Sequence, residues 1–286
     1  MWIVFNPAAG AARRRRLQRA VAALPGAEVA ATTAPGDAAR LAQQGLALGH
    51  RVIVAAGGDG TIAEVAGALH GHAATLGILP FGTANVLAHE LGLPRDAAAA
   101  ARVIAAGRRA PLHPGLAIAP DGTRRLFVQM LGAGFDAAVV HALPPGLKRR
   151  LGKGAYVLQT LGSLATYRFP PLRFRADGGA WEVAAALIVT KGRFYAGRFT
   201  IAPGASPLRP GFTLLAARRG GAGATLLAAA ALPLDLMHRM PFVTRREVQA
   251  LEIAGEGVPV QADGEAAGFL PLRVTAASAP LEVIIP

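Results

Sequence analysis

The sequence predicts an α/β protein of two domains. The first has a doubly wound, mainly parallel sheet, and the second is β-rich and mostly antiparallel. Through about residue 109, short apolar runs alternate with amphipathic or alanine-rich segments, which is the pattern of strands alternating with helices. Beyond that point, short strands separated by glycine and proline dominate. We place the domains at residues 1–112 and 113–286.

Local patterns predict each element of the first domain. Apolar runs predict strands at 2–6, 27–32, 51–56 and 75–80. The segments around them predict helices at 13–24, 37–48, 61–71, 83–92 and 96–107. Asp37 suits the N-cap of the second helix, and Gly71 suits the end of the third. In a sheet of this kind, ligands bind at the carboxyl ends of the strands.

Hairpin and strand signals predict the second domain. Asp121-Gly122 marks a tight turn between strands at 112–120 and 123–132. Further strands are expected at 180–190, 197–203, 211–219, 247–257, 258–265 and 271–276, with helices at 146–167 and 224–237. The last strand, at 281–286, is compatible with either domain.

Composition narrows the function classes. The 286 residues include 30 Lys and Arg against 17 Asp and Glu, a formal net charge of +13, and no cysteine. The charge favours nucleic acid, an anionic membrane surface or phosphorylated small molecules as partners, although GC-rich codon usage explains it equally well. Without cysteine there are no disulfides, thiolate nucleophiles or zinc–cysteine sites. No signal peptide or membrane-spanning stretch is apparent, so we expect a cytoplasmic protein.

Three loops at the carboxyl ends of predicted strands have a composition suited to phosphate. They are NPAAG (6–10), GGDGT (57–61) and PFGTAN (80–85). Each combines small residues with a hydroxyl or amide and leads into a predicted helix, whose N-terminal N–H groups bind anions. One such loop is weak evidence, because glycine-rich turns are common for packing reasons. Three at one edge of a sheet predict a polyphosphate site that is neither a Walker A loop nor GxGxxG.

These loops, together with LGAGFDAAVV (131–140), KRRLGKGAYVLQTL (148–161) and VQADGEAAGFLPLRV (260–274), resemble the diacylglycerol kinase catalytic-domain family. That family includes bacterial lipid kinases and the sphingosine and ceramide kinases. GGDGT alone is shared with NAD kinases and phosphofructokinases, whereas the ordered set with the late DGE is more specific to lipid kinases. The resemblance implies a fold like that of NAD kinase and diacylglycerol kinase, with the active site in the cleft between the domains.

The resemblance also implies ATP and Mg²⁺ as cofactors. The residues expected to contact ATP are Asn6, Pro7, Gly10, Thr32, Gly57, Gly58, Gly60, Thr61, Glu64, Gly82, Thr83 and Asn85. For Thr32, an ordinary turn hydroxyl is an equal alternative. Asp59 is expected to act on the Mg²⁺-bound phosphates, because Mg²⁺ commonly uses one or two carboxylates together with substrate phosphates.

A second pair of carboxylates lies in ADGE (262–265). The resemblance implies that Glu265 is the general base for the lipid hydroxyl, with Asp263 as its partner. The bland alternative is that Asp263-Gly264 is simply a hairpin turn. Replacing Asp59 or Glu265 with alanine is expected to abolish turnover and to leave the fold intact.

Three departures from the family pattern concern the second domain. Pro210 stands where relatives often carry an aspartate that helps hold a structural Mg²⁺, so we expect no second metal site. Thr190 and Lys191 stand in place of a usual asparagine, and His113 in place of an aspartate. None of these changes lies in the loops that are expected to bind ATP.

We therefore expect an ATP-dependent lipid kinase acting on diacylglycerol, or on ceramide or a sphingoid lipid. An NAD kinase-like small-molecule kinase and a degenerate basic membrane-binding protein are the alternatives. Basic clusters at 13–16, 108–109, 148–153, 218–219 and 245–246 suit an anionic membrane, so we expect peripheral association with its inner face. The segment 226–242 suits an acyl-chain cleft or an interfacial helix as well as a core helix. No nucleic-acid motif is found, and the oligomeric state is open, with a dimer as one option.

Overall fold

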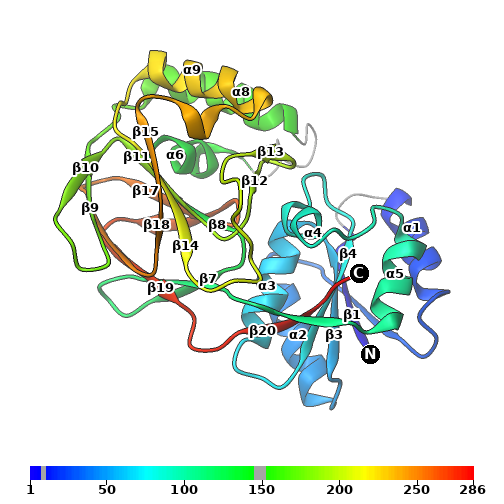
Figure 1. Ribbon diagram of the computed structural model, residues 1–286. Helices are drawn as coiled ribbons and strands as arrows, with labels where there is room; N and C mark the ends of the chain where they lie inside the picture. Colours follow the sequence, from blue (N-terminus) through cyan, green and yellow to red (C-terminus); the bar gives the residue numbers. More distant parts are fainter. Residues whose placement is uncertain (8–10, 145–152) are drawn as a thin grey trace. The chain divides into compact units, whose positions relative to one another are not determined.

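The computed structural model of the protein describes residues 1–7, 11–144 and 153–286. The chain forms two compact units (Figure 1). Unit 1 comprises Met1–His113 together with Ser278–Pro286, and unit 2 comprises Pro114–Ala277. Unit 2 is therefore inserted into unit 1 ahead of the last strand. Within the described ranges, no helix combines the length and apolar character needed to cross a bilayer.

Unit 1 is built on a six-stranded sheet in the order β2-β1-β3-β4-β20-β5. Its strands are β1 (Trp2–Phe5), β2 (Glu28–Ala31), β3 (Val52–Gly57), β4 (Thr75–Pro80), β5 (Arg109–Leu112) and β20 (Leu281–Ile284). Neighbours from β2 to β20 pair in parallel, and β5 pairs antiparallel with β20. The prediction of a mainly parallel sheet is thus confirmed.

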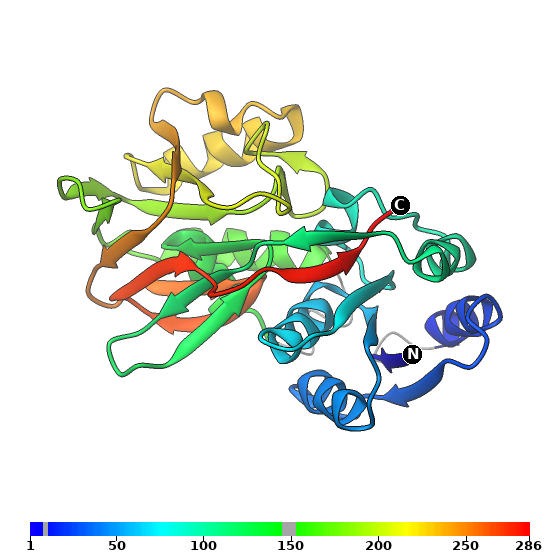
Figure 2. The same ribbon diagram turned by 60° about the horizontal axis from the view of Figure 1, so that its bottom comes forward.

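Helices cover both faces of this sheet (Figure 2). They are α1 (Ala11–Val21), α2 (Asp37–Ala47), α3 (Asp59–Leu69), α4 (Val86–Glu90) and α5 (Ala97–Ala106). Residues of α1 and α5 share one core cluster with Ile3 and Val54. Gly45 of α2 lies against Trp2 and Ile53, whose side chains point to the opposite face because strand side chains alternate. The sheet is therefore doubly wound.

Some predicted boundaries in unit 1 are wrong for local reasons. Helix α3 begins at Asp59 rather than Thr61, and α4 spans five residues only. The N-cap of α2 is Gly36, and Asp37 is its first residue. The Asp37 carboxylate instead accepts from the N–H and hydroxyl of Thr33, which closes the turn before the helix. The predicted strand at 112–120 is divided between the two units.

Unit 2 is a sandwich of two antiparallel sheets of six strands each. One sheet has the order β10-β9-β16-β19-β6-β7, with β6 (Gly115–Ile118), β7 (Arg124–Phe127), β9 (Leu172–Ala176), β10 (Glu182–Ala184), β16 (Leu251–Ala254) and β19 (Leu272–Ala276). The other has the order β15-β14-β11-β8-β17-β18, with β8 (Met130–Ala133), β11 (Ala186–Thr190), β14 (Phe212–Ala217), β15 (Val243–Val248), β17 (Pro259–Ala262) and β18 (Glu265–Phe269). The predicted β-rich, antiparallel second domain is confirmed.

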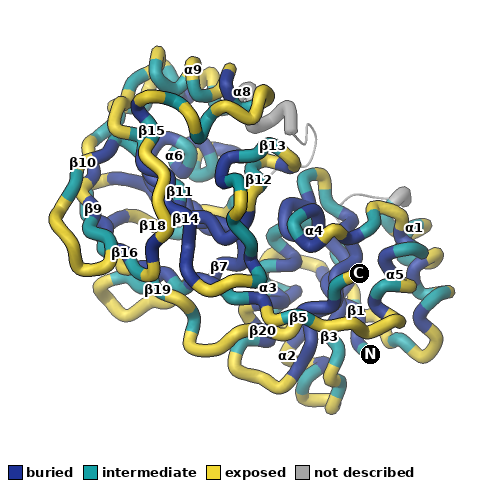
Figure 3. Tube along the Cα trace, in the orientation of Figure 1, coloured by how far each residue is buried: buried dark blue, intermediate teal, exposed yellow. Residues whose placement is uncertain are grey.

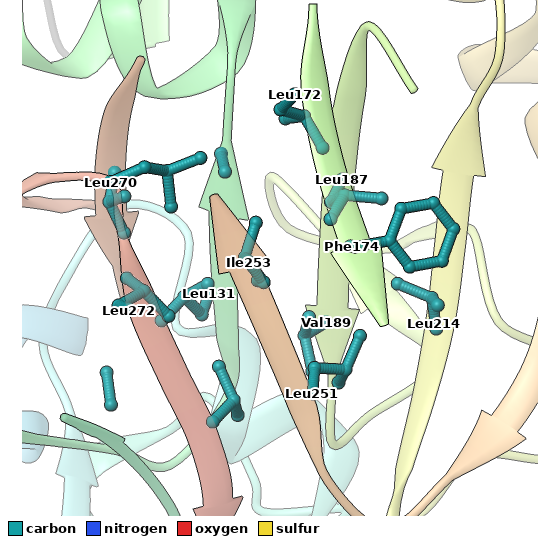
Figure 4. Packing of buried hydrophobic residues seen from close by; sticks show 14 of the residues in the cluster. Leu131, Leu172, Phe174, Leu187, Val189, Leu214, Leu251, Ile253, Leu270 and Leu272 are labelled. Atoms are coloured by element: carbon teal, nitrogen blue, oxygen red, sulfur yellow. The ribbon is translucent and has the colours of Figure 1, made fainter. Parts of the chain in front are cut away.

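The core of unit 2 lies between these sheets. Figure 4 shows Phe174 and Ile253 from one sheet among Leu187 and Leu214 from the other. All four side chains are essentially fully buried. The remaining elements are the hairpin β12 (Phe194–Tyr195) with β13 (Phe199–Thr200), the helices α6 (Phe135–Ala142), α8 (Lys153–Thr166) and α9 (Ala222–Ala231), and the 3-10 helices η1 (Leu232–Leu234) and η2 (Met237–Arg239).

Five expectations for unit 2 are corrected. The strand expected at 123–132 is two strands in different sheets, because β7 ends at Phe127 and β8 begins at Met130. The strand expected at 197–203 is reduced to the two residues of β13. The strand expected at 180–190 divides at Ala185, so that β10 joins one sheet and β11 the other. The strand expected at 247–257 is two strands, because β15 ends at Val248 and β16 begins at Leu251. The helix expected at 224–237 ends at Ala231 and is followed by η1, which contains Pro233. Strand β9 was not predicted. The first part of the helix expected at 146–167 lies outside the described residues.

Candidate active site

The strands β1, β3 and β4 end side by side at one edge of the unit 1 sheet. Phe5 pairs with Ala56, and Gly57 pairs with Pro80. The loops that follow these strands are bonded to the same edge, since Asn6 N–H donates to Ala56 O and Phe81 N–H donates to Gly57 O. The structure thus brings Asn6 and Pro7, GGDGT and PFGTAN to one edge. The rest of NPAAG, including Gly10, lies outside the described residues.

Two of these loops touch through their glycines. A Cβ atom added to Gly82 would lie 2.4 Å from the Cα of Gly58 and 2.7 Å from Oδ1 of Asn85. Contacts that short do not occur in folded proteins, so a side chain at Gly82 would push the loops apart. The N-cap of α3 is Gly58, which brings no side chain to the amides of the first helical turn. Such amides are suited to an anion.

Asn6 and Thr61 bond to each other across the first two loops. The side-chain amide of Asn6 donates to the Thr61 hydroxyl at 3.1 Å. Gly57 packs against the same threonine, because a Cβ there would lie 2.5 Å from its hydroxyl oxygen. These three predicted ATP contacts therefore also fix the geometry of the edge.

Asp59 and Asn85 shape the third loop. Asn85 adopts a left-handed conformation with φ 50°, and its Oδ1 accepts from Gly82 N–H at 2.8 Å. The Asp59 carboxylate accepts from Val86 N–H at 2.7 Å, so it caps α4 from the first turn of α3. Burial raises the pKa of Asp59, and the amide hydrogen bonds to its carboxylate oppose that rise.

The donor set at this edge suits a metal ion that is brought by a nucleotide. Among the described residues, no three His, Asp or Glu side chains lie together as a metal site. Among the described residues of the three loops, Asp59 is the one carboxylate, and it already accepts from Val86 N–H. Mg²⁺ bound to phosphates needs one or two carboxylates and retains several waters. The residues therefore fit Mg²⁺ carried by ATP rather than a resident ion.

The structure also places the other residues that were predicted to contact ATP. The Glu64 carboxylate accepts from Gly36 N–H at 3.3 Å and Ala38 N–H at 3.1 Å, so it caps the start of α2. Thr32 is buried, and its N–H donates to Phe5 O at the end of β2. Pro7 and Gly60 are half-buried, and Thr83 is exposed.

Two arginines of α1 bring positive charge to the same edge. Arg13 donates to Asn6 O at 3.4 Å. Arg16 donates to Pro80 O at 2.9 Å, and its guanidinium lies 4.7 Å from the centre of the Phe81 ring. Desolvation by burial lowers the pKa of both arginines. The four consecutive arginines at 13–16 were the sequence signal, because cations in a first helical turn oppose the helix dipole.

The ADGE segment of unit 2 forms a hairpin turn. Asp263 and Gly264 have φ 51° and 80° and join β17 to β18. The Asp263 carboxylate accepts from the N–H groups of Val128, Gln129 and Met130 at 2.8 to 3.0 Å. Asp263-Gly264 therefore forms a hairpin turn, and the roles expected of Asp263 and Glu265 stay predictions. Glu265 is the first residue of β18 and is exposed.

A half-buried carboxylate that was not predicted as a site residue supports this turn. Asp136, at the start of α6, accepts a short hydrogen bond from the Tyr195 hydroxyl and a second, at 3.0 Å, from Gln261 Nε2. Gln261 Oε1 in turn accepts from Gly264 N–H at 2.9 Å. Burial raises the pKa of Asp136, and its two donors oppose that rise. An acidic residue directly after the glycine-rich LGAGF was the available signal.

The loop that carries Pro210 is held by a side-chain ammonium. Lys191, 3% exposed, donates to Arg209 O at 2.9 Å and makes a short hydrogen bond to Gly211 O. Its Nζ also lies 4.9 Å from the centre of the Phe212 ring. Burial lowers the pKa of Lys191 to about 8, and Glu247 opposes this.

Two family models and several named relatives match this chain. The family model of the diacylglycerol kinase catalytic domain matches residues 1–117, and that of the YegS C-terminal NAD kinase beta sandwich-like domain matches residues 129–285. A Pseudomonas aeruginosa protein named "Probable lipid kinase YegS-like" is 33% identical over 273 residues, covering 90% of this chain and 84% of that protein. A Klebsiella pneumoniae protein of the same name is 35% identical over 162 residues, or 56% of this chain and 53% of that protein.

Solved structures share the fold. Two chains from Bacillus anthracis str. Sterne align with TM-scores of 0.78 and 0.72 at 21% and 19% identity. Each alignment covers 100% of this chain and 96% of the other. The second is a crystal structure of a diacylglycerol kinase. These structures show the fold, and together with the family models they define the class as a diacylglycerol kinase-type catalytic domain joined to a β-sandwich.

The chain belongs to the diacylglycerol kinase catalytic-domain family and carries the YegS-type C-terminal domain. The family expected from the motifs is thereby confirmed. The structure places the predicted site residues in two groups, one in each unit. Asn6, Gly58, Asp59, Thr61, Gly82 and Asn85 belong to unit 1. Asp263 and Glu265 belong to unit 2.

Proposed function

We propose that this protein is an ATP-dependent lipid kinase that transfers the γ-phosphoryl group of ATP to the hydroxyl of a membrane lipid. Diacylglycerol is the first candidate substrate, with ceramide or a sphingoid lipid as the second. The observation that carries the proposal is the edge of unit 1, where three glycine-rich loops follow adjacent parallel strands. Relatives named as lipid kinases support the choice of acceptor.

On this proposal, the unit 1 loops bind the nucleotide. The uncapped amides of the first turn of α3 and the charge of Arg13 and Arg16 attract the phosphates. Gly58 and Gly82 let the second and third loops pack closely against each other, which keeps these amides in place. Asp59 orients the metal-bound phosphates and, through Val86, the PFGTAN loop. When bound, Mg²⁺ neutralises charge on the transferring group.

Glu265 is proposed as the general base. Its carboxylate would take the proton of the lipid hydroxyl as that oxygen bonds to the γ-phosphorus. The bond from the γ-phosphorus to the bridging oxygen breaks, and ADP leaves. Asp263 and Asp136 have positioning roles, since they hold the turn before Glu265 through Val128 and Gln261. Phosphoryl transfer depends mostly on positioning and charge stabilisation, which suits such supports.

Because the proposed acceptor is a membrane lipid, the protein must act at a membrane surface. With a net charge of +13, the protein is attracted to anionic leaflets, and we propose peripheral association with the inner face. NAD kinase activity is the competing function, because GGDGT is shared between the two families.

The decisive experiment offers radiolabelled ATP and Mg²⁺ with diacylglycerol, ceramide, sphingosine, phosphatidylglycerol and NAD in parallel. Label on one of the lipids, absent with Glu265→Gln, is the expected result. Label on NAD alone would establish the competing function. Label on none of the five with folded protein would contradict both.

A further inference from the structure

Helix α9 is apolar on all sides, yet it is largely uncovered. Of its ten residues, all within the described chain, Ala231 alone is buried. Leu226 and Leu227 are 52% and 53% exposed, and in the following turns Leu234 is 68% and Leu236 41% exposed. Figure 3 shows this helix as a mostly exposed segment of unit 2. A helix that is hydrophobic all round is normally buried in a core or a membrane. We call Leu226, Leu227, Leu234 and Leu236 the α9 surface.

The fold itself holds these leucines outward. On the inner side of the segment, Leu232 and Met237 pack against the small core of Ile201 and Leu215. The Asp235 carboxylate accepts from Thr200 N–H, and Leu236 N–H donates to Ala231 O at 3.0 Å. The exposure of the α9 surface is therefore the result of an ordered turn anchored on β13 and β14. An apolar patch kept exposed in this way marks an interaction site.

The charge around the α9 surface identifies the kind of partner. From Arg218 to Arg246 the chain carries five arginines and one acidic residue, Asp235, which is already bonded to Thr200. Two of the five, Arg218 and Arg246, form ion pairs with Glu182. Arg219 lies just before α9 and is exposed, and Arg239 belongs to η2 and is exposed. Exposed leucines flanked along the chain by exposed arginines form a pattern that binds the interface of an anionic bilayer.

We propose that the α9 surface docks the protein on an anionic lipid bilayer, with the leucines entering the interface and Arg219 and Arg239 binding headgroup phosphates. The choice of a bilayer over another apolar partner rests on the proposed function. Docking through this surface would keep the protein on the leaflet that holds its lipid substrate.

Flotation of the full chain with vesicles tests this without nucleotide, so the result does not depend on any kinase activity. The vesicles contain phosphatidylcholine alone or mixed equally with phosphatidylglycerol. The wild type should float with the anionic vesicles. Leu226→Glu combined with Leu227→Glu should lower partitioning at least about tenfold, because two apolar groups are replaced by charges that the anionic surface repels.

Val183→Glu is the matched control, since Val183 on β10 is 59% exposed and lies outside the α9 surface. It should bind within about twofold of wild type, although it carries one of the apolar-to-acidic changes of which the leucine variant carries two. Arg219→Gln combined with Arg239→Gln should weaken binding to anionic vesicles alone. Thermal unfolding checks that each variant is folded.

Unchanged binding by the folded double-leucine variant would overturn the proposal, as would an equal loss with Val183→Glu. The proposal is also overturned if the wild type binds neither kind of vesicle but forms a dimer, and the leucine variant does not. In that case the α9 surface binds a second copy of the chain. If vesicles bind as expected while no lipid is phosphorylated, the kinase proposal fails and the docking surface stands.

Discussion

The carboxylate of Asp59 accepts a hydrogen bond from the backbone N–H of Val86 at 2.7 Å, so it joins the first turn of α3 to the first turn of α4. The acidic residue of GGDGT is thus part of the loop architecture as well as a candidate for phosphate chemistry. This changes the expectation that its removal leaves the fold intact. It also offers a way to separate the two roles.

Asp59→Ala should lower the free energy of unfolding by about 1 kcal/mol, the usual loss when a helix cap is removed. Asp59→Asn keeps an acceptor oxygen and should remain close to wild type in stability. Both variants should lose lipid phosphorylation if the charge is needed for the metal-bound phosphates. Urea unfolding and turnover, measured on the same preparations, check this. An asparagine variant with wild-type turnover would remove Asp59 from the chemistry.

Glu265→Gln should reduce turnover by about 10²- to 10⁴-fold, the usual contribution of a general base. Because the side chain is exposed on β18, stability should change little. Single-turnover kinetics and a urea curve make the comparison. If turnover falls only in proportion to a loss of stability, Glu265 is structural.

Asp263→Ala should strongly lower the free energy of unfolding, in contrast to substitutions of Glu265. The N–H groups of Val128, Gln129 and Met130 would lose their acceptor in a buried region. Unsatisfied buried amides cost about 1–3 kcal/mol each, so a loss on the order of 3 kcal/mol or more is expected. Glu265→Ala, two residues away, is the matched control. Equal stabilities in urea would show that Asp263 does not hold the turn.

Gly82→Ala should separate the two phosphate loops, since its Cβ would lie 2.4 Å from the Cα of Gly58. We expect a loss of about 1–3 kcal/mol in stability, as for other overpacked sites, together with weaker ATP binding. Gly67→Ala in α3 is the control, because nothing lies within 4 Å of the added atom. That change should stabilise the helix by about 0.5–1 kcal/mol. Thermal unfolding and nucleotide titration distinguish the two.

Lys191 predicts a pH dependence of stability. Burial lowers its pKa from 10.5 to about 8, so between these values the unfolded chain binds more protons than the folded one. Stability therefore rises with pH across this window. Relative to Lys191→Met, the wild type should gain free energy of unfolding from pH 8 to pH 10.5. Urea curves at several pH values measure the difference, and a difference that stays flat would contradict the assignment.

Much of unit 1 was predictable because its signals are local. Apolar runs gave the strands β1 to β4, and glycine-rich loops gave the edge at which they end. The partners of Glu64 and Asp59 were not predictable, since each caps a helix distant in sequence. In the sequence, a carboxylate beside glycines is as compatible with phosphate chemistry as with helix capping. The fold is needed to show which backbone N–H groups donate to it.

Unit 2 was harder to predict because its strands divide between two sheets. Nothing in the run from Trp181 to Thr190 marks Ala185 as the crossing point. Strand β9, with the sequence LRFRA, alternates leucine and phenylalanine with arginine, and in an arginine-rich chain that pattern is easily overlooked. Lys191 departs from the family pattern, but its hydrogen bond to Arg209 O, 18 residues further along the chain, depends on the path of the loop.

The return of β20 to the unit 1 sheet has a consequence for synthesis. This strand fills the place between β4 and β5, pairing Val283 with Leu76 and with Ala110. Until residues 281–284 have been synthesised, β4 and β5 lack the strand that pairs with both of them. Unit 2 completes its own sheets without that wait. A gene cut at residue 112 would therefore yield a unit 1 with an unpaired edge, which is a template for aggregation.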